Sequence, residues 1–187
     1  MVMTEKEKML SGELFCGWGN EIEKDYMHSK KLAFKYNKLP FYKSKKCAKI
    51  IKKWFGKIGE NFAIASPFVC EFGQNIEADE YFYVNSGCCF LDVCKISFGK
   101  NVLVGPNTSI YTASHPMDAE TRRTGLAYGK PVKIGNDVWI GGSVVILGGV
   151  TIGDNVIVGA GSVVTHDLEK DGIYAGNPAR LIRKLDM

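Results

Sequence analysis

The segment from Val132 to Val164 reads VKIGNDVWIGGSVVILGGVTIGDNVIVGAGSVV and places a branched aliphatic residue at every sixth position. Helical stripes recur after three or four residues and half-buried strands alternate at every second residue, so a period of six cannot describe one long element. A second apolar residue two positions earlier, with glycine following four of the six, indicates a short strand and then a corner. The pattern therefore predicts coils of a parallel β-helix that bury an aliphatic column by stacking. The six residues are Ile134, Ile140, Ile146, Ile152, Val158 and Val164.

The same period extends toward the N-terminus with less regularity. An ordinary β-sandwich would show variable spacing and hairpin dipeptides, which the constant interval does not fit. The lattice slips around LDVCKIS (residues 91–97) and is interrupted by residues 111–131, where we expect an extended loop with a functional role. The earlier lattice positions are Ile58, Ile64, Cys70, Ile76, Phe82, Cys88, Phe98, Val104 and Ile110.

Charge divides the chain of 187 residues, whose formal net charge is +4, into two regions. Residues 1–57 hold fourteen lysines against six acidic residues and are predicted to form a helical region, with a capping-box pattern at Thr4 and Glu7. Residues 58–187 are predicted to form the β-helix, with the inserted loop 111–131 and a C-terminal tail.

A basic amphipathic helix is predicted between Cys47 and Ile58, because apolar residues recur there at helical spacing opposite a row of lysines. The lysine face suits a membrane surface or a phosphate partner. The alternative, which we favour, is a solvated face whose apolar stripe covers the open end of the prism.

Composition and the N-terminal residues exclude some classes of protein. The opening residues are charged and contain no apolar run long enough for a secretion signal or a membrane span, so we expect a cytoplasmic protein. We expect neither a membrane nor a nucleic acid as partner.

The cysteines are expected to be core residues rather than ligands. Cys70, Cys88 and Cys94 follow one another at intervals of eighteen and six, on the same kind of lattice as the aliphatic residues, which predicts buried free thiols. No CxxC pair or Cys/His cluster occurs, so no metal site is expected.

The interrupting loop and a neighbouring coil contain candidate catalytic residues. His115 stands between Ser114 and Pro116, and an imidazole in such a position can accept a proton from a hydroxyl nucleophile; a surface histidine without a task is the alternative. Asn85, in YVNSGCC, either orients a substrate or the histidine, or belongs to an asparagine ladder that stabilises a corner.

Further candidates lie in and after the regular block. Trp139 alternates with inward positions and should face outward, and Gly142 allows a backbone N–H to approach a ligand closely. In the tail, Arg180 and Arg183 are suited to phosphate, although a solvated terminal helix is equally compatible with the charges.

Three motifs together resemble the maltose and galactoside O-acetyltransferases of the hexapeptide-repeat family: SHPMDAETRRTGLAYGKPVKIGNDVWIGG, GVTIGDNVIVGAGSVVT and AGNPAR. The resemblance runs from MLSGELF almost to the C-terminus. It implies a mainly β fold, a left-handed parallel β-helix with an N-terminal helical cap and an extended loop. It also implies a homotrimer with active sites between subunits, acetyl-CoA as donor and a sugar hydroxyl as acceptor.

The resemblance also implies roles for individual residues. His115 matches the general base, Asn85 an asparagine that positions the reacting groups, and Gly142 the N–H donor to the oxyanion. The positions that match the coenzyme A site are Trp139, Gly141, Gly142, Ala160, Thr165, His166, Arg180 and Arg183.

The acceptor pocket departs from the galactoside pattern. Glu71 stands where galactoside enzymes have a serine, Val93 follows Asp92 where they have a second acid, and LFCGWGNE lacks the usual N-terminal acid. These features favour an acceptor of the maltose or glucose type. The candidates for contacts with the acceptor are Glu71, Tyr83, Asp92 and Trp18.

Alternatives remain open at this point. A ping-pong route through an acetylated Cys88 or Cys89 competes with direct transfer to the hydroxyl. The acceptor could instead be a galactoside, an antibiotic or a lipid-like sugar, and a catalytically silent solenoid could serve only as a binding module.

Overall fold

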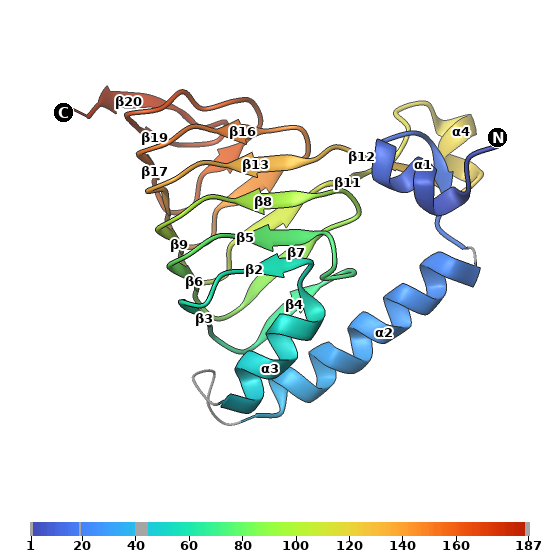
Figure 1. Cartoon of the computed structure of the whole chain (residues 1–187). Coiled ribbons are helices and arrows are strands. Elements are labelled where there is room, and N and C mark those ends of the chain that lie inside the picture. Colours follow the sequence, from blue (N-terminus) through green and yellow to red (C-terminus); the bar gives the residue numbers. More distant parts are fainter. Residues whose placement is uncertain (1, 19, 40–44, 186–187) are drawn as a thin grey trace.

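The computed structural model describes residues 2–18, 20–39 and 45–185, which form a tapering stack of short strands with helices at its lower end and side (Figure 1). Residues 1, 19, 40–44, 186 and 187, which fall in the predicted helical region and tail, lie outside the described residues. The helices are α1 (Glu5–Ser11), α2 (Asn20–Asn37), α3 (Lys45–Trp54) and α4 (Ala119–Arg123). The strands are β1 (Phe15–Cys16), β2 (Lys57–Ile58), β3 (Phe62–Ile64), β4 (Phe68–Cys70), β5 (Ile76–Ala78), β6 (Phe82–Val84), β7 (Cys88–Leu91), β8 (Ile96–Phe98), β9 (Val102–Val104), β10 (Ser109–Tyr111), β11 (Ala113–Ser114), β12 (Leu126–Gly129), β13 (Val132–Ile134), β14 (Trp139–Ile140), β15 (Val145–Leu147), β16 (Thr151–Ile152), β17 (Val156–Val158), β18 (Val163–Val164), β19 (Gly172–Ala175) and β20 (Arg180–Lys184).

Parallel strands from successive coils build the three faces of a prism. The charged face contains β2, β5, β8, β13 and β16, and the loop face contains β4, β7, β10, β15 and β18. The tryptophan face contains β3, β6, β9, β14, β17 and β19, with β20 added at its edge. Each strand of these faces is short because the chain turns a corner after a few residues, as the six-residue period predicts.

Inward-facing residues stack in register from coil to coil. Ile134 pairs with Ile152 on the charged face, and Ile140 pairs with Val158 on the tryptophan face. These columns merge into one core cluster that runs the length of the prism. Aromatic rings fill the N-terminal coils, with the rings of Phe82 and Phe98 4.6 Å apart, whereas branched aliphatic residues fill the later coils. The mainly β, coiled fold predicted from the sequence is confirmed.

The length of the coils explains why the lattice slips. Cys70 pairs with Phe90, 20 residues later, whereas Ile134 pairs with Ile152, 18 residues later. The additional residues of the early coils lie at the corner between the loop face and the charged face, after β4 and after β7. Residues 111–131 are inserted at the same corner one coil later, and they project from the side of the prism (Figure 1).

Cys94 lies in this enlarged corner, which corrects its predicted place on the core lattice. Cys70 and Cys88 belong to the core of the prism, as expected. Cys94 is also buried and free, but its thiol donates to the backbone carbonyl oxygen of Met9 in α1, 3.1 Å away. The extra residues of the corner move it off the inward column and under the N-terminal helix.

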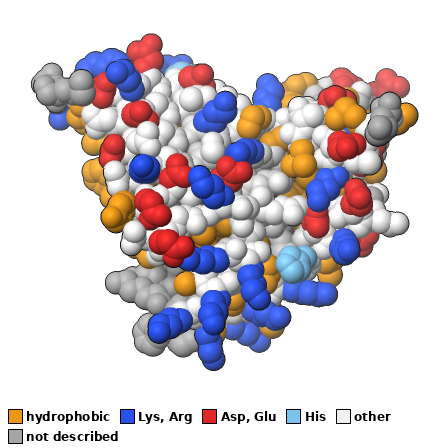
Figure 2. Space-filling model, in the orientation of Figure 1, with side chains coloured by type: hydrophobic (Ala, Val, Ile, Leu, Met, Phe, Trp, Pro, Cys, Tyr) orange, Lys and Arg blue, Asp and Glu red, His pale blue; other side chains and the backbone are white. Residues whose placement is uncertain are grey.

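The predicted basic helix does cover the open end of the prism. Cys47, Ile51 and Trp54 of α3 are buried, and the indole of Trp54 packs edge-on against Phe68 at 5.7 Å between ring centroids. The Trp54 Nε1–H donates to the hydroxyl of Ser29 in α2, so the two helices are joined beneath the first coil. The lysines of α3 gather on the outer surface at the lower end of the molecule (Figure 2).

The N-terminal helix and the inserted loop pack against each other. The predicted capping box is present, with the Thr4 side chain bonded to the Glu7 N–H and the Glu7 side chain to the Thr4 N–H. Strand β1 pairs antiparallel with β12 of the loop, and β12 pairs with β11. Among the described helices, none has the length and apolar character required to cross a membrane.

The C-terminal tail is a strand, so the alternative of a terminal helix is wrong. Residues Arg180–Lys184 pair antiparallel with β19 at the end of the tryptophan face. An exposed edge of backbone N–H and C=O groups at the last coil offers these residues hydrogen-bond partners, and pairing satisfies them.

Stacking predicts a sharp contrast between adjacent residues of β13. Replacement of the buried Ile134 with alanine should lower the free energy of unfolding by about 2–5 kcal/mol, because it removes apolar contacts to the coils on both sides. Replacement of its outward neighbour Lys133 with alanine should change it by less than about 0.5 kcal/mol. Denaturant unfolding of both variants measures the difference, and equal losses would contradict the assigned core.

Candidate active site

His115 is held in one orientation at the end of β11. Its Nδ1 lies 3.0 Å from the backbone carbonyl oxygen of Leu126, an acceptor, so Nδ1 carries the proton and Nε2 is the unprotonated nitrogen of the neutral ring. The loop around it is tied down by Arg122, whose guanidinium donates to the carbonyl oxygens of Pro116 and Met117. The imidazole is thus exposed, oriented and able to accept a proton at Nε2.

The orienting group comes from the backbone and not from an acidic side chain. Asp118, which is close in sequence, instead accepts from the Thr121 N–H at 2.7 Å as the N-cap of α4. Sequence patterns give no signal for a carbonyl eleven residues away, because the contact depends on how β12 folds back on β11.

His115 lies in a cavity of about 420 Å³, which we call the histidine pocket. It forms where the enlarged corner meets β1 and the start of α2. Trp18 and Glu71, both predicted acceptor contacts, line it together with His115. No local pattern of the sequence marks the other walls, because they come from segments far apart in the chain: Phe15, Gly17, Ile22, Glu23, Tyr26, Phe72, Leu91, Val93, Ala113, Gly125 and Ala127.

Asp92 supports the histidine pocket from below and cannot contact a ligand, which corrects its predicted place among the acceptor contacts. It is fully buried, and its carboxylate accepts from the backbone N–H groups of Glu71, Phe72 and Gly73 at 2.7–2.9 Å. Burial raises the pKa of Asp92 to about 7, against the lowering effect of these N–H donors. Asp92 therefore fixes the backbone from which Glu71 projects.

A second cavity, of about 440 Å³, follows the corner between the tryptophan face and the loop face. We call it the glycine groove. It is lined by Asn85, Trp139, Gly141, Gly142 and Ala160 from different coils, and also by Tyr83, which was predicted to contact the acceptor. The remaining lining residues are Leu103, Val104, Gly105, Pro106, Ile157, Val158 and Gly159.

Two polar groups of the glycine groove have no partner among the described residues. The Gly142 N–H makes no hydrogen bond there, whereas the Gly141 N–H donates to the carbonyl oxygen of Val158 at 2.8 Å. The Asn85 side-chain oxygen accepts from the Ser86 N–H, which leaves its amide N–H₂ group without an acceptor in the same residues. The groove therefore offers donors to an incoming oxygen atom.

The two glycines differ in what the fold requires of them. A Cβ at Gly141 would lie 2.6 Å from the backbone nitrogen of Ala160, so the stacking of the next coil excludes any side chain there. A Cβ at Gly142 would lie 3.3 Å from Pro106, a tight but less severe contact. The close packing of coils at the corner explains why residue 141 must be glycine. At Gly142 the absence of a side chain leaves the backbone accessible from the groove.

The predicted coenzyme residues fall into separate places. Trp139 is 53% exposed between the buried Val138 and Ile140, as its outward position predicted. Beyond the groove, the Arg180 guanidinium lies 3.3 Å from the His166 ring, which in turn contacts the Thr165 hydroxyl. Arg183, on β20, pairs through its backbone with Ile173 and has no side-chain contact with that group.

A single chain does not bring His115 and Asn85 together. They lie in different cavities, at opposite corners of the loop face: His115 beyond β10 and Asn85 before β7. Figure 1 shows β11 and β12 projecting on one side of the prism and β6 and β9 at the other edge. Within one chain the two residues therefore belong to separate cavities.

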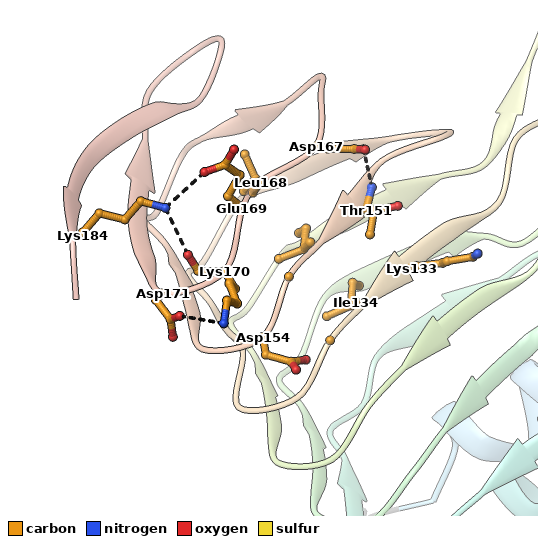
Figure 3. A pocket seen from close by; sticks show the side chains of 13 residues that line it. Lys133, Ile134, Thr151, Asp154, Asp167, Leu168, Glu169, Lys170, Asp171 and Lys184 are labelled. Carbon is orange, nitrogen blue, oxygen red and sulfur yellow. Dashed lines mark hydrogen bonds and ion pairs between the residues drawn. The ribbon is translucent and has the colours of Figure 1, made fainter. Parts of the chain in front are cut away.

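A third cavity, of about 800 Å³, opens on the charged face near the C-terminus (Figure 3). Most of its charged side chains pair with one another or with nearby backbone: Lys184 pairs with Glu169 at 3.2 Å, and Asp167 accepts from the Thr151 N–H at 2.7 Å. No group of three or more His, Cys, Asp or Glu side chains suited to a metal ion occurs within residues 2–18, 20–39 and 45–185. This cavity contains none of the predicted site residues.

The cysteines near the site are poor nucleophiles. Burial raises the pKa of Cys88 to about 11, and burial also raises the pKa of Cys89. The Cys88 thiol donates to the carbonyl oxygen of Gly105 inside the prism. Because the thiolate is the reactive form, these thiols are not prepared to carry an acyl group.

Comparison with known proteins identifies the family to which the fold belongs. Residues 131–166 match the model of bacterial transferase hexapeptide repeats, and residues 8–59 match the maltose acetyltransferase hexapeptide capping motif. A maltose O-acetyltransferase from Clostridium difficile 630 is 45% identical, with a TM-score of 0.98 and full coverage of both chains.

Two further relatives agree with this class. A hexapeptide-repeat acetyltransferase from Vibrio cholerae, solved with acetyl coenzyme A, is 39% identical with a TM-score of 0.92, covering 99% of this chain and 100% of that one. The galactoside O-acetyltransferase of Escherichia coli is 36% identical over 186 residues, covering 100% of this chain and 92% of its own length. The chain belongs to the maltose and galactoside O-acetyltransferase family of hexapeptide-repeat enzymes, and it is an acetyltransferase.

The raised pKa of Asp92 predicts a pH-dependent stability. The folded protein binds a proton there up to about pH 7, whereas the unfolded carboxyl group releases it near pH ~3.9. Between these values the folded state binds more protons, so the contribution of Asp92 to the free energy of unfolding falls as pH rises.

Asp92→Asn is the matching variant, because it keeps one acceptor oxygen but does not titrate. It should be less stable than the wild type by about 1–3 kcal/mol at about pH 5. The gap should narrow as the pH rises to about 8, measured by denaturant unfolding at fixed protein concentration. A difference in stability that widens as the pH rises would show that the N–H donors lower the pKa of Asp92 more than burial raises it.

Proposed function

We propose that the protein transfers the acetyl group of acetyl-CoA to a hydroxyl group of a sugar of the maltose or glucose type. The observation that carries the proposal is the pairing of two unused groups: the Nε2 atom of an oriented His115, and the Gly142 N–H that has no acceptor among the described residues. A base for the hydroxyl and a donor for the developing oxyanion are the two functions that such a transfer requires.

The glycine groove suits the coenzyme. It is lined by apolar side chains, backbone and uncharged polar groups, among them the exposed ring of Trp139, which fits a long, weakly polar pantetheine arm. Arg180 and Arg183 are exposed on β20 at the end of the same face, where guanidinium groups are available to the phosphates.

The outward residues of the three faces support a homotrimer. The charged face presents Lys57, Glu77, Ser97, Lys133 and Thr151. The tryptophan face instead presents Ala63, Tyr83, Leu103, Trp139, Ile157 and Ile173. The loop face presents Val69, Cys89, Ser109, Val145 and Val163. Figure 2 shows basic and acidic side chains mixed over the side of the molecule that is in view. One charged face beside two weakly polar faces is the arrangement expected of a wedge that packs around a threefold axis with its charged face in water.

A trimer of this kind also completes the site. The glycine groove and the histidine pocket lie at opposite corners of the loop face, so packing a tryptophan face beside the loop face of the next copy brings the groove of one chain toward the pocket of another. In that arrangement His115 of one subunit deprotonates the sugar hydroxyl, and the Gly142 N–H and the Asn85 amide of the next subunit stabilise and position the thioester oxygen.

A direct transfer is favoured over the ping-pong route, because burial keeps Cys88 and Cys89 protonated. A galactoside, an antibiotic or a lipid-like sugar remains the alternative class of acceptor. A silent binding module is disfavoured, since it needs neither an oriented His115 nor an unpaired N–H in the groove.

Replacement of His115 with alanine tests the proposed base. The variant should lose about 10²–10⁴-fold in kcat for sugar-dependent release of coenzyme A, because the hydroxyl loses its proton acceptor. Binding of acetyl-CoA, measured by calorimetry, should be unchanged. His28→Ala, an exposed histidine on α2, is the matched control and should keep full activity. Full activity in the His115 variant would refute the assignment.

Mixing two inactive variants tests whether the site is shared. His115→Ala and Asn85→Ala, unfolded and refolded together in equal amounts, should regain about a quarter of wild-type activity. In a random mixture half of the subunits carry an intact His115 and the other half an intact Asn85. A shared site therefore has both residues intact in about a quarter of cases. Refolding each variant alone is the control. No recovery on mixing would place both residues of a working site in one chain.

A further inference from the structure

The histidine pocket has a charge pattern that acetylation of a neutral sugar does not require. The charged side chains that line it are those of Glu23, in the first turn of α2, and Glu71, after β4. No Lys or Arg among the described residues lines the cavity. The lining of the pocket therefore contains two acidic side chains with no Lys or Arg of the same chain to balance them.

Both carboxylates are without partners. Neither the Glu23 nor the Glu71 side chain makes a hydrogen bond or an ion pair with any residue that the structure describes. Lys30 lies beside the pocket but forms no ion pair with either glutamate: its Nζ donates to the carbonyl oxygen of Cys70 at 3.1 Å and lies 4.5 Å from the ring of Tyr26, a lining residue. Lys6 pairs with Asp25 at 2.6 Å.

Glu71 is also held in place. Its backbone N–H donates to Asp92 at 2.9 Å and to the carbonyl oxygen of Phe90 at 3.2 Å, so the carboxylate projects from a fixed point of the pocket wall. A preorganised, unpaired carboxylate that is partly withdrawn from solvent is stabilised by a cation that enters with a ligand.

The two cavities differ in the charge of the ligand that they favour. The glycine groove has no charged lining residue, and exposed arginines lie beyond it, which suits the anionic coenzyme. The histidine pocket repels anions through Glu23 and Glu71, which keeps it free for an acceptor of the opposite charge.

The apolar walls indicate that this acceptor also has a hydrocarbon face. Rings of Phe15, Trp18, Tyr26 and Phe72 line the pocket, and Tyr26 and Phe72 meet edge to face at 6.5 Å. Such rings pack against the C–H face of a pyranose, and about 420 Å³ admits a mono- or disaccharide.

We infer that the preferred acceptor is a cationic amino sugar, a 2-amino-2-deoxyhexose unit of the glucose type, whose ammonium group binds Glu71 and Glu23. This inference rests on the proposed function and names the substrate class of that same site. The carboxylates keep the amine protonated, so it is not a nucleophile. The hydroxyl oxygen forms the new bond to the acetyl carbon, the C–S bond breaks, and His115 passes the hydroxyl proton to the departing thiolate. The product is an O-acetyl sugar with a free ammonium group.

The test compares three acceptors that differ in charge at one ring position: glucose, glucosamine and N-acetylglucosamine. For the wild-type trimer, kcat/KM with glucosamine should exceed that with either neutral sugar by about tenfold or more, and the advantage should shrink at high salt. Glu71→Gln should lower kcat/KM for glucosamine at least about tenfold more than it lowers kcat/KM for glucose, because only glucosamine brings an ammonium group to the carboxylate. Glu21→Gln, in the same turn of α2 but outside the pocket, is the matched control and should change nothing.

Each outcome bears on a different claim. The cationic acceptor would be refuted if wild-type kcat/KM with glucose equalled or exceeded that with glucosamine, or if Glu71→Gln lowered kcat/KM equally for all three sugars. The proposed function would still stand in either case, provided that acetylation depended on His115. A product acetylated on nitrogen, identified by NMR, would overturn it as well. Absence of acetylation with every sugar, despite bound acetyl-CoA, would contradict the proposed function itself.

Discussion

Stacking of inward-facing residues in register, coil upon coil, is the constraint on which the rest of the structure depends. A coil has no core of its own, because each rung contributes only one or two apolar side chains to the interior. Ile134 is buried only because Ile152 and Phe98 lie above and below it. Stacking requires strands of fixed length, and this leaves the corners as the places where sequence can vary. The chemistry of the molecule is accordingly found at two corners.

The enlarged corner shows how a site is added to such a scaffold. Extra residues after β4 and β7 and the loop after β10 extend from successive coils, so they lie beside one another and form a wall. A protruding wall needs internal support, and Asp92 supplies it by accepting three backbone N–H groups of the coil below. This support requires a carboxyl group to be buried, which disfavours its charged form and therefore raises the pKa of Asp92. Cys94 and Met9 close the inner side of the wall against α1.

The sequence predicted what is periodic and missed what depends on contacts between distant segments. The six-residue period predicted the coils and the outward position of Trp139, and the helical spacing of apolar residues predicted the covering role of α3, since each follows from a local pattern. The break in the six-residue period near Asp92 was visible in the sequence, but its structural consequence was not. Because of the two additional residues, Cys94 lies under α1 and Asp92 is buried beneath Glu71. The carbonyl of Leu126 and the rings of Phe15, Tyr26 and Phe72 left no local signal, because the folding of β1, α2 and β12 onto the corner creates those contacts.

The central claim is that one chain carries two half-sites, a groove for the coenzyme and a pocket for the acceptor, and that neighbouring copies join them. Its most direct test is a crystal structure of the protein with coenzyme A and a sugar. The account predicts a coenzyme whose sulfur lies near the Gly142 N–H of one subunit and near His115 Nε2 of another, with the sugar between Glu71 and that imidazole. A coenzyme whose sulfur met His115 and Gly142 of the same chain, or neither residue, would contradict the account.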